Sequence, residues 1–325
     1  MLTRREYLAL TAQAGATLAF GAISGCASTV ATTSQAPRAQ AGILTRKIPK
    51  TGEQLPIVGL GSSATFSQVA GADDMEAIKS VFMTMLEQGG TVFDTAPGYG
   101  ASEEAAAKAV NDLTVRDRVF WATKLNVARR GASADPAQAR EQVETSFKLL
   151  GRDKIDLIQV HNVADMATQF PILEEYKQAG RVRYIGTTST FKGQYDVLER
   201  FMTSTNDCDF IGIDYSVDNL SAEERILPLA QEKKIAVLGY MPTGRTRLFQ
   251  RVKGQEVPGW ARELGAETWA QFFLKFAASH PAITVVTPAT SKPEHMVDNM
   301  GAAHGRLPTE AERKRMVDFI AKLPG

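Results

Sequence analysis

The sequence lacks the features that would assign it to several specialised classes of protein. Its 325 residues include only two cysteines, Cys26 and Cys208, and no apolar run approaches the roughly 20 residues of a membrane-spanning helix. The charges nearly cancel, with 37 Lys and Arg against 36 Asp and Glu, so the composition indicates no nucleic-acid partner. The four histidines are scattered, without carboxylate or thiol neighbours at ligand spacing, and no metal site is expected. What remains is the composition of an ordinary globular protein, which leaves the oligomeric state open.

The N-terminal segment resembles a bacterial export signal. Arg4 and Arg5 precede a weakly apolar stretch that ends at Cys26 in the sequence Ile-Ser-Gly-Cys, which is similar to a lipobox. The pattern predicts a twin-arginine signal over residues 1–26, a lipid on Cys26, and a flexible tether over residues 27–42. We therefore expect export across the bacterial inner membrane, to a periplasmic or lipid-anchored place in the cell envelope, with membrane contact only through that anchor. A chance Ala/Gly-rich helix is the alternative.

From residue 43 onward, short apolar runs alternate with amphipathic stretches. Two runs around the turn at residues 51–53 predict a β-hairpin. The later runs are mostly continuous rather than alternating, as expected for parallel strands buried on both faces. These strand candidates are residues 57–60, 91–94, 119–123, 156–160, 182–186, 210–213, 235–239 and 283–286. We therefore expect an α/β fold over residues 43–325, a (β/α)8 TIM barrel with an N-terminal hairpin and an extra C-terminal helix at 308–323. A doubly wound sheet is disfavoured, because residues 59–63 lack the third glycine of a dinucleotide-binding turn.

Three consecutive strand candidates end on ionisable side chains. Asp94 closes the second strand, Lys124 the third and His161 the fourth, while Tyr99 lies in the loop after Asp94. Because catalytic groups of such barrels lie where the strands end, these four side chains should share one site. Taken singly, each has an ordinary structural explanation, such as a helix cap, a half-buried ring, a solvated charge or a structural histidine. Their coincidence at adjacent strand ends favours a catalytic site.

The four residue types suit proton transfer to a carbonyl oxygen. Reduction of a carbonyl needs a proton donor for the oxygen as a hydride reaches the carbon. A tyrosine with a pKa near ~10 is a weak acid, so we expect the ammonium of Lys124 to lower the pKa of Tyr99. Asp94 would keep that buried ammonium charged, and His161 would donate a hydrogen bond to the substrate oxygen.

Longer motifs around these residues resemble those of the aldo-keto reductase family, in the family's order. The matching segments are residues 93–100 with 102–104, 122–124, 156–161 and 183–186. The resemblance implies an NAD(P)-dependent oxidoreductase of the EC 1.1.1 type that reduces small aldehydes or ketones, or oxidises the corresponding alcohols. It further implies that Asp94, Tyr99, Lys124 and His161 are the catalytic tetrad.

The same resemblance implies a nicotinamide dinucleotide cofactor, NADP(H) more than NAD(H). The residues that it places on the cofactor are Ser62, Asp94, Thr188, Ser189, Tyr240, Pro242, Thr290, Ser291, His295 and Asn299. Among them, Tyr240 is expected to stack on the nicotinamide ring. The sequence departs from the family pattern at Ser189, where asparagine is usual, and at Gly212, where glutamine is usual. Ala289 and His295 stand where the family has basic residues, which weakens the preference for NADP(H).

Substrate specificity in such barrels comes from loops, here residues 125–135 and 245–264. The second loop carries cations that either bind phosphate or, as we favour, are solvated: Arg245, Arg247, Arg251 and Lys253. A second class of function also stays open, a cofactor-binding sensor or scaffold on the same barrel with little turnover. The predicted export favours it, because the cell envelope has no obvious supply of NADPH.

Overall fold

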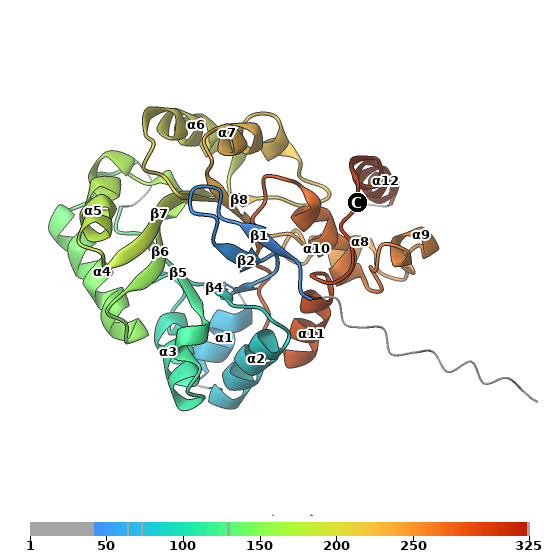
Figure 1. The fold of residues 1–325 in the computed structure, drawn as a ribbon, viewed down its shortest axis with the longest axis horizontal. Helices are drawn as coiled ribbons and strands as arrows, with labels where there is room; N and C mark the ends of the chain where they lie inside the picture. The colour runs from blue at the N-terminus through green and yellow to red at the C-terminus, as the bar shows by residue number, and fades with distance from the viewer. Residues whose placement is uncertain (1–41, 64, 73, 129–130, 324–325) are drawn as a thin grey trace, which may run out of the picture. The chain divides into compact units, whose positions relative to one another are not determined.

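Eight parallel strands follow one another in chain order in the computed structural model, which describes residues 42–63, 65–72, 74–128 and 131–323 (Figure 1). Bridges from Val58 to Val286 and from Gly61 to Ala289 join the first strand to the last, and the amide of Gly59 donates to the carbonyl oxygen of Val286 at 2.9 Å. The sheet is therefore closed, which confirms the predicted (β/α)8 barrel. Its strands are β3 (Leu60–Gly61), β4 (Val92–Asp94), β5 (Phe120–Leu125), β6 (Ile155–Val160), β7 (Val182–Ser189), β8 (Phe210–Asp214), β9 (Ala236–Tyr240) and β10 (Val285–Val286).

Helices surround the strands on the outside (Figure 1). The inward face of α2 (Met75–Glu87) is apolar and buried, as Ile78, Phe82 and Met85 illustrate, and it belongs to the apolar cluster that also contains strand residues such as Phe93. The helices are α1 (Thr65–Gly71), α2 (Met75–Glu87), α3 (Ser102–Asp112), α4 (Pro136–Leu150), α5 (Met166–Gln178), α6 (Tyr195–Ser204), α7 (Ile226–Glu232), α8 (Arg247–Arg251), α9 (Gly259–Arg262), α10 (Trp269–Ser279), α11 (Pro293–Gly301) and α12 (Glu310–Ala321). Single 3-10 turns occur at Arg116–Arg118, His161–Val163, Lys192–Gln194 and Ser221–Glu223.

A hairpin closes the end of the barrel at which the strands begin. Strands β1 (Thr45–Lys47) and β2 (Gln54–Pro56) pair antiparallel, which confirms the predicted hairpin. Ile48 and Leu55 are buried with Val92, at the start of β4, and with other apolar side chains of the barrel interior. Water is thereby excluded from that end, and the cavity described below opens at the other.

The chain ends in the predicted extra helix, α12. Thr309 caps its first turn, and the Glu312 side chain accepts in return from the amide of Thr309 at 2.8 Å, so two amides at the helix start are satisfied. Within the described residues, no helix combines the length and apolarity that crossing a bilayer requires. The predicted signal of residues 1–26, with Cys26, and residues 27–41 of the predicted tether lie outside the described residues.

The close spacing of β7 and β8 depends on Gly186. A Cβ added there would lie 1.9 Å from the carbonyl oxygen of Phe210. We therefore expect Gly186→Ala to lower the free energy of unfolding by about 1–3 kcal/mol. Gly259→Ala in α9 is the matched control, because a Cβ there would have no atom within 4 Å. Urea unfolding of the two variants measures the difference, and equal midpoints would contradict this account of the packing.

Candidate active site

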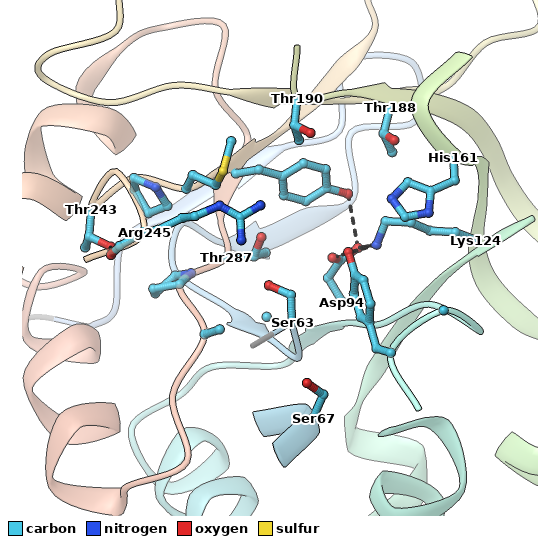
Figure 2. Close-up of a pocket in the computed structure, with 18 of the residues that line it drawn as sticks. Ser63, Ser67, Asp94, Lys124, His161, Thr188, Thr190, Thr243, Arg245 and Thr287 are labelled. Carbon is cyan, nitrogen blue, oxygen red and sulfur yellow. Dashed lines mark hydrogen bonds and ion pairs between the residues drawn. The ribbon is translucent and has the colours of Figure 1, made fainter. Parts of the chain in front are cut away.

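A cavity of about 840 Å³ opens where the strands end, and its wall includes Asp94, Tyr99, Lys124 and His161. Figure 2 labels Asp94, Lys124 and His161 among the side chains that line it. Asp94 is the last residue of β4, Lys124 lies at the end of β5, and His161 follows β6 directly. The parallel registers pair Asp94 with Ala122 and Lys124 with Gln159, which brings these strand ends to one edge of the sheet. The structure therefore brings together the four side chains that the sequence placed in one site.

The centre of the site is a buried ion pair. Nζ of Lys124 donates to Oδ2 of Asp94 at 2.8 Å, to Oδ1 at 3.0 Å, and to the carbonyl oxygen of Thr95 at 2.8 Å. Burial alone would lower the pKa of Lys124, but the interactions with its neighbours, first of all with the Asp94 carboxylate, outweigh burial, and the pKa lies above its usual value. Burial raises the pKa of Asp94, and the ammonium offsets only part of that rise. The amine is therefore charged at neutral pH, with all three of its protons directed at acceptors.

Tyr99 holds its proton more firmly than the sequence argument predicted. Nζ of Lys124 lies 5.2 Å from the centre of the Tyr99 ring, which is near enough to stabilise a phenolate. Burial nevertheless raises the pKa of Tyr99, and this effect exceeds the lowering by Lys124; Asp94 raises the pKa further and Arg245 lowers it. The predicted net lowering is wrong, because desolvation of the phenolate dominates. The residue is a neutral phenol at neutral pH, ready to donate.

His161 lies beside the phenol as a neutral ring. The Tyr99 and His161 rings meet edge to face, with their centres 6.1 Å apart and their planes at 85°. Burial, followed by the charge of Lys124, lowers the pKa of His161 to about 4. Its Nδ1 is buried and has no hydrogen-bond partner among the described residues. A neutral imidazole carries one N–H donor, as the predicted hydrogen bond to a substrate oxygen requires.

The comparisons with known proteins agree with this geometry. A model described as the Aldo/keto reductase family matches residues 57–316. The chain belongs to this family. Aldo-keto reductase YhdN of Bacillus subtilis is 32% identical over 202 residues, which cover 59% of this chain and 60% of the relative, less than two thirds of that protein's length. The NADH-specific methylglyoxal reductase of Escherichia coli is 29% identical over 244 residues, covering 67% of this chain and 73% of the relative.

Solved structures of the family share the fold. An aldo-keto reductase from Bacillus halodurans in its holo form superposes with a TM-score of 0.68 at 24% identity, over 86% of this chain and 97% of that one. An aldo/keto reductase from Klebsiella pneumoniae, in complex with NADP and acetate, superposes with a TM-score of 0.65 at 20% identity, over 86% of this chain and 96% of that one. At 24% and 20% identity, the similarity to these structures shows the fold alone.

The predicted cofactor residues of this aldo/keto reductase fall into two groups. Asp94, Thr188, Tyr240 and Pro242 line the cavity, and Ser62 is buried beside Gly61 of its wall with no partner for Oγ among the described residues. The remaining predicted contacts lie outside the wall of this cavity. Ser189 donates instead to Gln194 at 3.1 Å, and the others follow β10 or lie on α11: Thr290, Ser291, His295 and Asn299.

Tyr240 lines the cavity, and its hydroxyl also forms two hydrogen bonds inside the barrel. Its ring packs over Gly212, and its hydroxyl lies 3.1 Å from Oδ1 of Asp94 and 3.0 Å from Oε1 of Gln159. Sequence reasoning missed Gln159 altogether. The available signal was its position two residues before His161 on β6, since alternate residues of a strand point to the same side.

Arg245 is a second residue whose place only the structure shows. It lines the cavity, where Figure 2 shows its guanidinium reaching inward from the side opposite Asp94, and it forms no hydrogen bond or ion pair through its side chain in the part of the chain that the structure describes. Arg247 instead binds Asp218 at 2.7 Å, and Arg251 donates to the carbonyl oxygen of Leu323 at 3.2 Å. The predicted cations of this loop therefore differ, because Arg247 and Arg251 are bound to other parts of the protein and the Arg245 side chain is not bound to any described residue.

Proposed function

We propose that the chain is an NAD(P)H-dependent oxidoreductase that reduces small aldehydes or ketones, or oxidises the corresponding alcohols, with Tyr99 as the proton donor. The observation that carries the proposal is the buried Lys124–Asp94 pair beside a neutral Tyr99 phenol in the wall of one cavity. Membership of the aldo/keto reductase family supports it.

The cavity has groups that suit a dinucleotide. Oγ of Ser62, Oγ1 of Thr287 and Oδ1 of Asn162 are buried without a hydrogen-bond partner among the described residues, a costly state that a polar ligand or water relieves. Arg245 adds a cation to which no carboxylate of the described residues is bound, which suits a phosphate. A nicotinamide dinucleotide bound there would supply the hydride.

The cofactor preference that we propose is NADP(H) over NAD(H). The Klebsiella pneumoniae structure contains NADP, whereas the Escherichia coli relative is named NADH-specific. Lys292 supports the proposal, because it is a cation at the start of α11. In this proposal α11 and the loop before it hold the adenosine phosphate through the predicted contacts Thr290, Ser291, His295 and Asn299.

Each member of the tetrad then has one task. His161, as a neutral donor, orients the carbonyl oxygen. Tyr99 transfers its hydroxyl proton to that oxygen as negative charge develops on it. Lys124 stabilises the phenolate that remains, and Asp94 holds the ammonium in place and charged. Solvent then returns a proton to Tyr99.

Removal of the Tyr99 hydroxyl tests the proton donor. We expect Tyr99→Phe to lower kcat for simple aldehydes roughly 100-fold or more, while NADPH affinity is retained. The other phenol in the described part of the cavity wall, Tyr240, has its hydroxyl hydrogen-bonded to Asp94 and Gln159. NADPH consumption measures the rate and quenching of protein fluorescence measures binding. Tyr176→Phe, on the outer helix α5, is the control with the wild-type rate expected. Equal rates for wild type and Tyr99→Phe would refute the mechanism. If the wild type binds NADPH tightly but does not consume it, the result would favour the alternative function, a cofactor-binding sensor or scaffold with little turnover.

Two neighbouring arginines test the phosphate contact. We expect Arg245→Gln to raise the Kd for NADPH about 10- to 100-fold, as the loss of a charge-assisted hydrogen bond does. Arg247→Gln is the matched control, because its guanidinium is already bound to Asp218 outside the cavity wall. Fluorescence titration at low and at moderate salt measures both. Equal Kd values for the two variants would show that Arg245 does not contact the phosphate and is solvated, which is the alternative that the sequence analysis favoured.

We also propose that residues 1–26 direct export and that Cys26 carries a lipid. The paired Arg4 and Arg5 and the lipobox-like sequence support this proposal. A translocase for folded proteins would let the chain leave with its dinucleotide bound. Mass spectrometry of the protein made in a bacterium should find acylated Cys26 in the wild type and in Cys208→Ser, and none in Cys26→Ser. The proposal would be refuted if the wild type were found as a soluble protein that keeps residues 1–26 and carries no lipid on Cys26.

A further inference from the structure

Tyr240 connects three strands inside the barrel. It is the last residue of β9, and its hydroxyl reaches Asp94 on β4 and Gln159 on β6. Nε2 of Gln159 donates to the carbonyl oxygen of Thr187 at 3.2 Å, so the oxygen of that amide faces Tyr240. The hydroxyl therefore lies between two acceptors, at 3.1 Å from Asp94 and 3.0 Å from Gln159, with a single proton to donate.

Gly212 makes this position of the ring possible. A Cβ at residue 212 would lie 2.1 Å from Cε2 of Tyr240 and 2.7 Å from its hydroxyl oxygen. Any larger residue would fill the volume that the ring occupies. The glycine and the inward tyrosine are thus complementary, and together they place a phenol hydroxyl against the ion pair.

We infer that Tyr240 is a positioning residue of the proposed reduction, which holds the Asp94 carboxylate through its hydroxyl and thereby the Lys124 ammonium beside Tyr99. The inference rests on the proposed function. When Asp94 is ionised, Tyr240 donates to it in a charge-assisted hydrogen bond. When Asp94 takes up a proton, it donates to Tyr240, which then donates to Gln159. The first arrangement is the stronger, so the hydroxyl favours the ionised carboxylate.

Titratable groups from several neighbouring elements face the ion pair. Burial acts against the charge of Asp94, which Lys124, Tyr240 and Tyr99 face. His161, which follows β6, interacts with Lys124. Tyr99 and Glu103, the latter on α3, face Lys124. The substitution Tyr240→Phe removes only the hydroxyl among these groups, and it leaves the aromatic ring over Gly212 and any face that the ring offers to a cofactor.

The test reads the ionisation of Asp94 directly. In full-length protein labelled with ¹³C-aspartate, the Asp94 signal is identified by its loss in Asp94→Asn. We expect the pH midpoint of the Asp94 titration to rise by about one unit in Tyr240→Phe, because the ionised carboxylate loses a hydrogen bond. The acidic limb of kcat/KM should move upward by the same amount, and kcat should fall several-fold, while the Kd for NADPH stays within about two-fold of wild type.

Two further variants separate this role from general damage. Tyr195→Phe removes another buried hydroxyl, which donates to Asp214 at 2.9 Å and lies outside the cavity wall, and it should leave the Asp94 midpoint unchanged. Gly212→Ala keeps the hydroxyl but crowds the ring, and it should reproduce the shift of Tyr240→Phe.

Each outcome decides a different claim. An unchanged Asp94 midpoint in Tyr240→Phe overturns the inference, as does a weaker Kd for NADPH with an unchanged pH profile, which would make Tyr240 a surface for the cofactor ring alone. A shifted midpoint in a protein that reduces no carbonyl compound supports the contact and defeats the proposed function.

Discussion

The site depends on one interaction, the buried ion pair between Lys124 and Asp94. The two residues are only 2% and 4% exposed, so each charge is costly unless the other is present. The barrel meets this requirement through adjacent parallel strands, since β4 and β5 deliver the carboxylate and the amine to the same edge. The carbonyl oxygen of Thr95 accepts the remaining proton of the ammonium. A loop or a flexible surface would not hold these atoms at such distances without water.

Burial acts on the neighbouring groups in a consistent way. It raises the pKa of Tyr99 and lowers that of His161 to about 4, so both are neutral beside a charged ammonium. A neutral phenol holds a proton to give, and a neutral imidazole donates one hydrogen bond without placing a second cation near Lys124. In the proposed mechanism the ammonium stabilises the phenolate only as it forms, which lowers the energy of the charged state that follows proton transfer rather than that of the resting site.

The two ends of the barrel have different tasks. The hairpin and the apolar interior of the barrel close one end. The other end carries the polar layer in which Asp94, Lys124, Gln159 and Tyr240 meet. The departure from the family pattern at Gly212 is matched by the inward position of Tyr240. Gly212, which departs from the family pattern in the sequence, thus forms one arrangement with Tyr240 in the fold.

The sequence by itself determined the barrel and the four side chains that meet at its open end, Asp94, Tyr99, Lys124 and His161. Continuous apolar runs of strand length identify buried parallel strands, and Asp94, Lys124 and His161 stand at successive strand ends, so local patterns were sufficient. The tertiary structure decided the direction of the Tyr99 pKa, the inward position of Tyr240 and the difference between Arg245 and Arg247. These properties depend on burial and on distances between residues far apart in the chain; Tyr240 meets Asp94 across 146 positions. No pattern along the sequence carries that information, because it arises only when the strands close into a barrel.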